Sequence, residues 1–176
     1  DMEFRPDYFI KDGEIIKGDE WTIQGVFTPG HTSNHMSYSF LEEKVLFTGD
    51  HVMGWSTTVI VPPDGDMGDY MESLRKLLKR EDNIYMPTHG EPIKNPKRFV
   101  RALINHRKMR EKQLLDYLKY NNASINEMIP KFYSTTNSKL WPAAAKSLLA
   151  LLLYLERLEY VQCNDKNNYD EAWGLL

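Results

Sequence analysis

Three short segments of this 176-residue chain share one pattern: a strand-length apolar run that ends beside a glycine and a potential metal ligand. They are residues 28–32, 46–50 and 87–90. The ligands that they carry are His31, Asp50 and His89. A strand that ends in a tight, glycine-permitted turn holds a side chain rigidly at the rim of a sheet, and imidazoles and carboxylates are typical zinc ligands. The pattern therefore predicts a β-rich fold that gathers these three side chains at one sheet edge, where they bind metal.

The order His31, Asp50, His89 suits a site with two metal ions. A carboxylate between two imidazoles can bridge cations about 3.5–4 Å apart while each imidazole binds one of them. Zinc hydrolases normally add a local pair of ligands, such as two histidines separated by one residue. None of the five histidines is spaced in this way. The sequence therefore predicts part of a metal centre, with Asp50 as its bridging and catalytic carboxylate.

Side chains beside the three ligands are candidates for supporting roles. His35 lies four residues after His31 and opens the next strand, which favours packing or support of a ligand over metal binding. His51 follows Asp50 directly, and because adjacent strand residues point to opposite faces, it is expected to face away from the metals. The next stretch either lines the substrate cleft or forms an ordinary surface loop: Trp55, Ser56, Thr57 and Thr58.

The chain divides into three regions. Residues 1–95 are mainly β structure with one helical stretch, and residues 96–121 predict a single connecting helix with a basic face. Residues 122–176 predict helices at 125–133 and 142–158 and then a hairpin. Short helices that precede a hairpin are typical of a small winged-helix domain. The predicted class is α+β.

Strand signals are clearest in the first region. Asp12 and Gly13 lie between apolar residues 8–10 and 14–16, which predicts a β-hairpin. Further strands are predicted at residues 21–27, 36–41, 44–48 and 84–86, and the last hairpin at residues 160–162 and 169–173. One face of the early strands is expected to carry large apolar side chains: Trp21, Ile23, Val26, Tyr38, Phe40, Val45 and Phe47.

Charge is unevenly distributed along the chain. The formal net charge is −3, yet residues 94–112 contain eight Lys or Arg and one acid, a local charge of +7. Such a stretch is a candidate phosphate-contacting surface, and a solvated helix face is the alternative. Arg107 and Glu111 stand four residues apart on the apolar stripe and are predicted to pair. Arg101 and Lys108 are predicted to face solvent.

Composition excludes several classes of protein. The single cysteine, Cys163, rules out an internal disulfide framework. The longest apolar run is interrupted and too short to cross a bilayer, so no membrane partner is expected. The second helix of the last region carries two bases, Lys146 and Arg157, which is too few for sequence-specific DNA binding. These features fit a cytoplasmic protein, but Asp1 is not an initiator methionine, so targeting is not predicted.

The motifs resemble those of the metallo-β-lactamase superfamily, also called the glyoxalase II-like hydrolases. The wider pattern resembles its lactamase-beta-two-like branch, which includes metal-dependent ribonucleases and has a C-terminal winged-helix domain. The matching stretches are residues 28–36, 56–59, 69–74, 87–93 and 106–113. The resemblance implies an αββα sandwich of which residues 1–95 form the C-terminal half.

The same resemblance implies the roles of the site residues. His31 would bind the first of two zinc ions, His89 the second, and Asp50 would bridge them. The remaining ligands of the family come from a His-x-His-x-Asp-His loop that this sequence does not contain. The chain therefore resembles the C-terminal part of such an enzyme. We expect it to be inactive alone, and to self-associate or pair with the missing N-terminal half.

Three functions remain open at the level of sequence. The first is a metal-dependent nuclease that acts on single-stranded RNA, supported by the branch resemblance and the basic stretch. The second is a hydrolase of a small-molecule acyl substrate, either a thioester or a lactone, similar to hydroxyacylglutathione hydrolase, because fold and metal site do not fix the substrate. The third is a non-enzymatic winged-helix interaction module.

Overall fold

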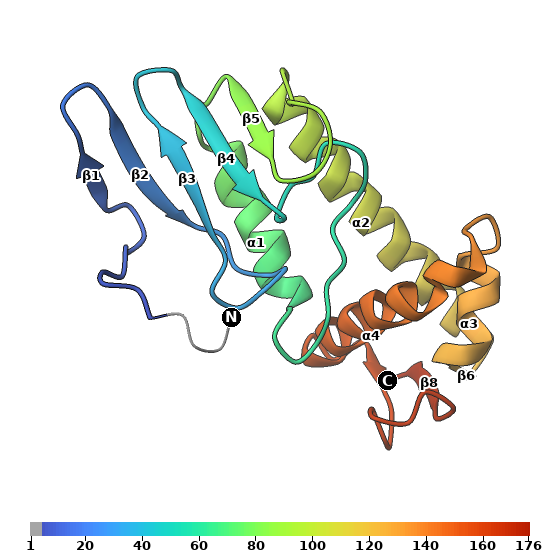
Figure 1. Cartoon of the computed structure of the whole chain (residues 1–176). Coiled ribbons are helices and arrows are strands. Elements are labelled where there is room, and N and C mark those ends of the chain that lie inside the picture. Colours follow the sequence, from blue (N-terminus) through green and yellow to red (C-terminus); the bar gives the residue numbers. More distant parts are fainter. Residues whose placement is uncertain (1–4) are drawn as a thin grey trace.

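A five-stranded sheet forms the first part of the computed structural model, which describes residues 5–176. Its strands lie in sequence order (Figure 1): β1 (Ile15–Lys17), β2 (Thr22–Phe27), β3 (Met36–Phe40), β4 (Val45–Gly49) and β5 (Ile84–Pro87). Neighbours from β1 to β4 are antiparallel, whereas β4 and β5 are parallel. A parallel pair needs a long crossover, and helix α1 (Met67–Leu78) lies in it.

The two faces of this sheet differ in burial. Helix α1 and the following helix lie on one face (Figure 1), where Val26, Leu46 and Tyr85 are buried. The opposite face carries Tyr38 and Phe47, which are cross-strand neighbours and are 40% and 45% exposed. The predicted apolar face is therefore correct for these two residues. It is wrong for Val26, because side-chain alternation along β2 turns Val26 toward the helices.

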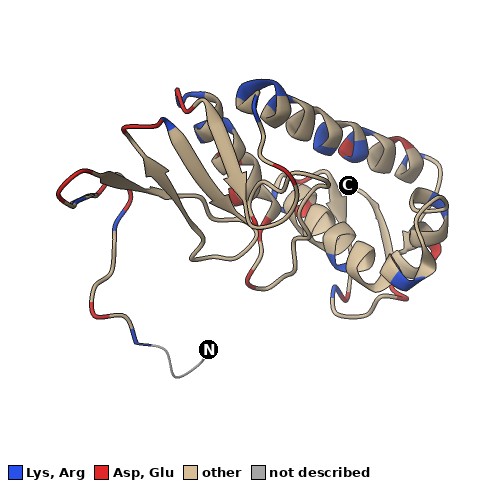
Figure 2. Ribbon diagram, turned by 45° about the horizontal axis from the view of Figure 1, so that its top comes forward, with Lys and Arg blue, Asp and Glu red and all other residues tan. Residues whose placement is uncertain are grey.

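The predicted long helix is present as α2 (Pro96–Leu118). Its buried residues contact both α1 and a strand of the C-terminal region, and Arg101 and Lys108 are exposed as predicted. Lys and Arg are frequent along it (Figure 2). The predicted pairing of Arg107 with Glu111 is wrong: both are partly buried, but Arg107 reaches across to the first region.

The C-terminal region has two helices and three short strands. These are β6 (Ala123–Ser124), α3 (Ile125–Phe132), α4 (Trp141–Arg157), β7 (Val161–Gln162) and β8 (Ala172–Leu175), with a short 3-10 turn, η1 (Ser138–Leu140), before α4. The strand order is β6-β8-β7, and Trp173 at the centre is fully buried. The antiparallel pairing of β7 with β8 confirms the terminal hairpin. Assignment of this region to the winged-helix class stays a prediction.

The predicted hairpin around Asp12 and Gly13 is wrong. A turn is present, since the Glu14 amide donates to the Lys11 carbonyl at 3.1 Å, but residues 8–10 form no strand. Strand β1 instead pairs with β2, which supplies a longer partner. Among the described residues, no helix combines the length and apolar character that a bilayer span requires.

Candidate metal centre

The three predicted ligands lie together at one edge of the sheet. His31 is in the loop between β2 and β3, Asp50 follows β4 and His89 follows β5. Nε2 of His31 is 4.0 Å from Oδ2 of Asp50, and Nε2 of His89 is 3.5 Å from Oδ1. Because β4 and β5 are parallel, their carboxyl ends and the two ligands after them meet at the same edge. The predicted convergence is therefore confirmed, and metal binding itself stays a prediction.

The donor set fits metal ions. Oδ1 of Asp50 is buried and has no hydrogen-bond partner among the described residues, and a buried polar atom of this kind is rare unless an ion or water satisfies it. Each imidazole faces a different oxygen of Asp50, which is the arrangement of a bridging carboxylate. Within residues 5–176, no group of three or more ligand-type side chains could hold one ion. The bridging arrangement and the lack of a three-ligand group agree with each other. Three ligands divided between two metal positions leave each position with fewer than the four ligands that zinc usually has.

The His31 ring is held in one orientation from behind. Its Nδ1 lies 2.7 Å from the carbonyl oxygen of Val59 and 3.1 Å from Oγ1 of Thr58. A carbonyl oxygen accepts hydrogen bonds, so Nδ1 carries the proton and the lone pair of Nε2 points toward Asp50. A hydrogen bond to the far nitrogen is the usual support of a metal-binding histidine. Thr58 therefore supports His31, in addition to the cleft role predicted for it.

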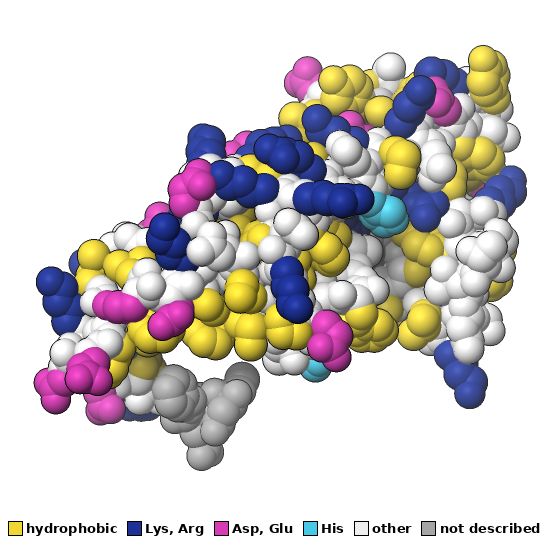
Figure 3. All heavy atoms as spheres, turned by 90° about the horizontal axis from the view of Figure 1, so that it is seen from above, with side chains coloured by type: hydrophobic (Ala, Val, Ile, Leu, Met, Phe, Trp, Pro, Cys, Tyr) yellow, Lys and Arg dark blue, Asp and Glu magenta, His cyan; other side chains and the backbone are white. Residues whose placement is uncertain are grey.

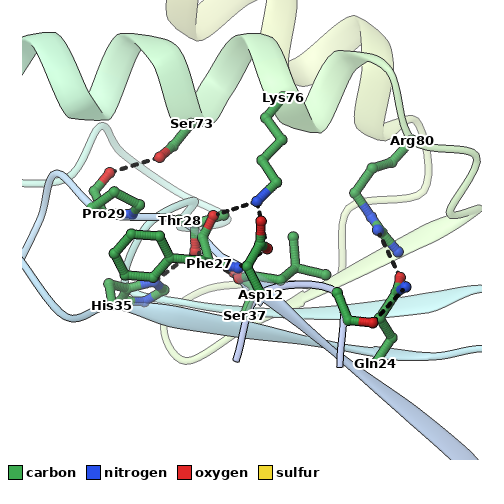
Figure 4. A network of polar contacts seen from close by, with 12 residues as sticks. Asp12, Gln24, Phe27, Thr28, Pro29, His35, Ser37, Ser73, Lys76 and Arg80 are labelled. Atoms are coloured by element: carbon green, nitrogen blue, oxygen red, sulfur yellow. Dashed lines mark hydrogen bonds and ion pairs between the residues drawn. The ribbon is translucent and has the colours of Figure 1, made fainter. Parts of the chain in front are cut away.

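His35 occupies a supporting position, as the sequence predicted. Its Nδ1 is 2.9 Å from Oγ1 of Thr28, which is in turn 2.9 Å from Oγ of Ser37 (Figure 4). Burial is the main cause that lowers the pKa of His35, and the charge of His31 lowers it further. The ring also packs on Gly49, since a Cβ there would lie 2.6 Å from Nε2. His35 thus supports the loops of both His31 and Asp50.

His51 points away from Asp50 into the core. It is fully buried, its ring centroid is 4.7 Å from that of Tyr70, and neither ring nitrogen has a partner among the described residues. Burial, followed by the nearby imidazoles of His35 and His31, lowers the pKa of His51 well below its ordinary value. The predicted opposite orientation of Asp50 and His51 is confirmed, and His51 acts as a neutral packing residue.

A groove runs along α2, and its lining does not include His31, Asp50 or His89. Its wall is the loop of residues 53–59, whose Gly54 amide donates to the His89 carbonyl oxygen at 2.8 Å. Three adjoining hollows of about 490, 290 and 480 Å³ share lining residues along it. All four residues predicted for the cleft line this α2 groove: Trp55, which is 73% exposed, Ser56, Thr57 and Thr58. Lys and Arg side chains gather along one face of the molecule (Figure 3).

Sequence reasoning missed residues that act from other elements. Tyr70 on α1 packs against His51, and Val59 holds His31, although neither stands near a ligand in the sequence. Ser73 on α1 donates to the Pro29 carbonyl oxygen at 2.8 Å (Figure 4), which anchors the loop before His31. Val59 and Ser73 lie within stretches that resemble the family, but the local sequence does not indicate their roles, which arise from contacts across 28 or more positions.

Known proteins resemble this chain in sequence or fold to different extents. The model of the metallo-beta-lactamase superfamily matches residues 1–89. The beta-lactamase-like protein 2 homolog of Drosophila melanogaster is 33% identical over 156 residues, which cover 84% of this chain and 52% of the relative. The atrochrysone carboxyl ACP thioesterase of Aspergillus fumigatus is 39% identical over 106 residues, which cover 60% of this chain and 32% of the relative. The chain thus spans about half the length of these relatives or less.

Two solved structures match nearly the whole chain. A metallo-beta-lactamase family protein from Thermus thermophilus has a TM-score of 0.80 at 20% identity, covering 95% of this chain and 54% of that one. A beta-lactamase domain protein from Burkholderia ambifaria has a TM-score of 0.85 at 18% identity, covering 97% and 53%. At these identities the likeness concerns the fold alone. With a family match over half of its residues, the chain belongs to the metallo-beta-lactamase superfamily.

Proposed function

We propose that the protein carrying this chain is a hydrolase with two zinc ions, one held by His31 and the other by His89, and that Asp50 bridges them. The observation that carries the proposal is the position of the Asp50 carboxylate between the two imidazoles. When bound, such ions supply a hydroxide nucleophile near neutral pH and polarise the bond to be cleaved. The chain alone is expected to be inactive, because each ion lacks further protein ligands.

Single-stranded RNA is the substrate class that the α2 groove supports best. Trp55 exposes its indole beside the loop of His89, where an unpaired base can stack on it. Lys94 and Arg98 line the hollow at one end of the groove, and Arg110 lines the hollow at the other. Proteins commonly bind single strands by stacking bases on aromatic side chains while nearby Lys and Arg side chains contact the phosphates.

A thioester or another small-molecule acyl compound is the second candidate substrate. The middle of the α2 groove is lined by Phe99, Ala102 and Leu103, which favour an acyl chain over a phosphate backbone. One relative is a thioesterase by name, although its similarity to this chain covers only 60% of the chain. The same metal centre can activate water against a carbonyl.

Hydrolysis assays on the protein that carries this chain together with the region present in its longer relatives separate the two candidates. Zinc-loaded protein should cleave single-stranded RNA faster than duplex RNA, and its RNA affinity should fall steeply with salt. Trp55→Ala should raise KM for RNA, because stacking contributes about 1–3 kcal/mol per base.

Asp50→Ala should abolish cleavage. Turnover of an acyl thioester without RNA cleavage would select the second candidate instead.

A further inference from the structure

Arg107 occupies an unusual place on α2. Its Nη2 donates to the carbonyl oxygen of Thr58 at 2.6 Å, and its Nε is buried without a hydrogen-bond partner among the described residues. Arg107 is partly buried, yet within residues 5–176 it forms no ion pair at 4.0 Å or less. Partial burial of a guanidinium without a carboxylate partner costs free energy, so the contacts that hold Arg107 in this position are of interest.

The contacts of Arg107 lead directly to the first metal ligand. Thr58, whose carbonyl oxygen Arg107 holds, also places its Oγ1 3.1 Å from Nδ1 of His31. The next residue, Val59, supplies the carbonyl oxygen that accepts from the same nitrogen at 2.7 Å. The two residues that set the His31 ring are therefore fixed through the peptide unit that Arg107 binds.

A second route from Arg107 runs through Tyr70. The guanidinium carbon lies 5.1 Å from the centroid of the Tyr70 ring, and that ring also packs against the buried ring of His51, next to Asp50. The Tyr70 backbone also packs against Gly30, where an added Cβ would lie 2.3 Å from Cα of Tyr70. Arg107 thus contacts groups that back the loops of both His31 and Asp50.

We propose that Arg107 is a positioning residue for the metal centre, which holds His31 in the tautomer that offers Nε2 to the metal by fixing the Thr58–Val59 peptide. The proposal rests on the proposed metal-binding role of His31. Arg107 touches neither metal nor substrate in this role. Its planar group binds a carbonyl oxygen and lies over an aromatic ring at the same time, which a lysine ammonium reproduces in part.

Arg110 provides a matched control on the same helix. It lines the same 480 Å³ hollow as Arg107, but it donates to the carbonyl oxygen of Phe132 at 3.0 Å and lies over the Tyr133 ring at 4.9 Å. Both arginines thus have the same kind of contacts, one toward His31 and the other toward the C-terminal region. Removal of Arg110 changes the charge of the groove by the same amount as removal of Arg107, but it leaves the contacts that support His31 in place.

The test is side-chain nitrogen NMR of the metal-free 176-residue chain, at a pH where the imidazoles are neutral. The native chain should show His31 as a single tautomer with the proton on Nδ1. Arg107→Met should give a mixture of both tautomers, Arg107→Lys should restore part of the native population, and Arg110→Met should leave His31 unchanged. Backbone amide spectra confirm that each variant is folded.

An unchanged His31 tautomer in folded Arg107→Met overturns the proposal, and so does an equal effect of Arg110→Met. Should Arg107→Met fail to fold, Arg107→Lys decides, since an unchanged His31 spectrum in that variant overturns the proposal as well. The readout requires neither metal nor substrate. A failure to cleave RNA therefore leaves the positioning role standing, and a failed tautomer test leaves the proposed hydrolysis standing.

Discussion

Gly30 forms the turn that presents His31. Its φ of +132° lies outside the range that side chains with a Cβ adopt readily, and an added Cβ would lie 2.4 Å from the backbone nitrogen of Tyr70. The Gly30 carbonyl oxygen also accepts from the Asp66 amide at 2.9 Å. The loop before His31 is therefore packed directly on the start of α1, at a distance that glycine alone permits.

Gly30→Ala should destabilise the chain far more than Gly13→Ala. At Gly13, φ is +77° but nothing lies within 4 Å of an added Cβ, so the cost is that of a left-handed backbone, about 1–2 kcal/mol. At Gly30 the clash with Tyr70 adds to the strain, and the loss should reach or exceed the upper end of the ~0.5–3 kcal/mol typical of substitutions. Urea unfolding measures both, and equal losses would contradict the packing at Gly30.

Individual ligands were predictable from sequence because each carries a local signal. His31, Asp50 and His89 end apolar runs beside glycines, and that short pattern alone predicted their convergence. The partner of Arg107 was not predictable, because helical spacing pointed to Glu111 on the same helix while the real partner, Thr58, lies 49 positions away. Contacts between elements determine the partner of a side chain such as Arg107, and residue spacing within one helix does not reveal those contacts.

Helix α1 contacts α4, and the Asp66 carboxylate forms an ion pair across this contact. Asp66 caps α1 by accepting from the Asp69 amide at 3.0 Å, and it pairs with both terminal nitrogens of Arg157 at 2.6 and 2.8 Å. The hydrogen bonds from Arg157 are the largest cause that lowers the pKa of Asp66 from 3.8. One side chain thus links the metal-centre region to the C-terminal region.

Asp66→Asn should lower stability at neutral pH by at most about 1 kcal/mol, because asparagine still caps the helix and a partly exposed ion pair contributes little. The pKa of Asp66 is lower in the folded chain than its ordinary 3.8, so the stabilisation is present above pH 3.8 and is lost as pH falls below it. Urea unfolding at several pH values should therefore show the native and Asp66→Asn curves converging below pH 3.8. A constant difference down to the lowest pH would contradict the ion pair.

Element boundaries could be predicted from sequence where a periodic pattern extended over many residues, and the prediction was wrong where the signal was only a few residues long. The periodicity of α2 predicted its extent to within a few residues at either end, since 23 residues repeat one apolar face. The two-residue turn signal at Asp12 and Gly13 did not define a hairpin, because β1 forms its backbone hydrogen bonds with β2 and not with residues 8–10. The face of Val26, by contrast, follows from alternation within β2 alone: three positions separate Val26 from Ile23, so their side chains lie on opposite faces.

Much of one face of the five-stranded sheet is apolar and exposed among the described residues, although residues 10 and 11 cover it at Gly25. Tyr38, Phe47 and Met86 are neighbours across β3, β4 and β5 and are between 37% and 45% exposed. The helices lie on the other face (Figure 1). The two solved structures above extend well beyond the part that this chain matches. We therefore propose that a second polypeptide layer, or a second copy of the chain, covers this face.

Sedimentation velocity of the 176-residue chain should reveal self-association through this face, because a contiguous apolar patch of this kind marks an interaction surface. Phe47→Glu should shift the chain toward monomer. Tyr120→Glu is the control, since Tyr120 is 87% exposed but lies beyond the end of α2, away from the sheet. A stable monomer at all accessible concentrations, or an equal effect of the two variants, would count against the proposal.

The shared metal centre is tested most directly by titration of zinc into the chain, followed through the side-chain NMR signals of its histidines. His31 and His89 should shift together at the same zinc concentration, whereas His106 on α2 should not respond. Asp50→Asn should weaken both responses in parallel, because the Asp50 carboxylate lies between the two imidazoles. If His31 and His89 respond independently, or if Asp50→Asn leaves both unchanged, Asp50 does not bridge two metals.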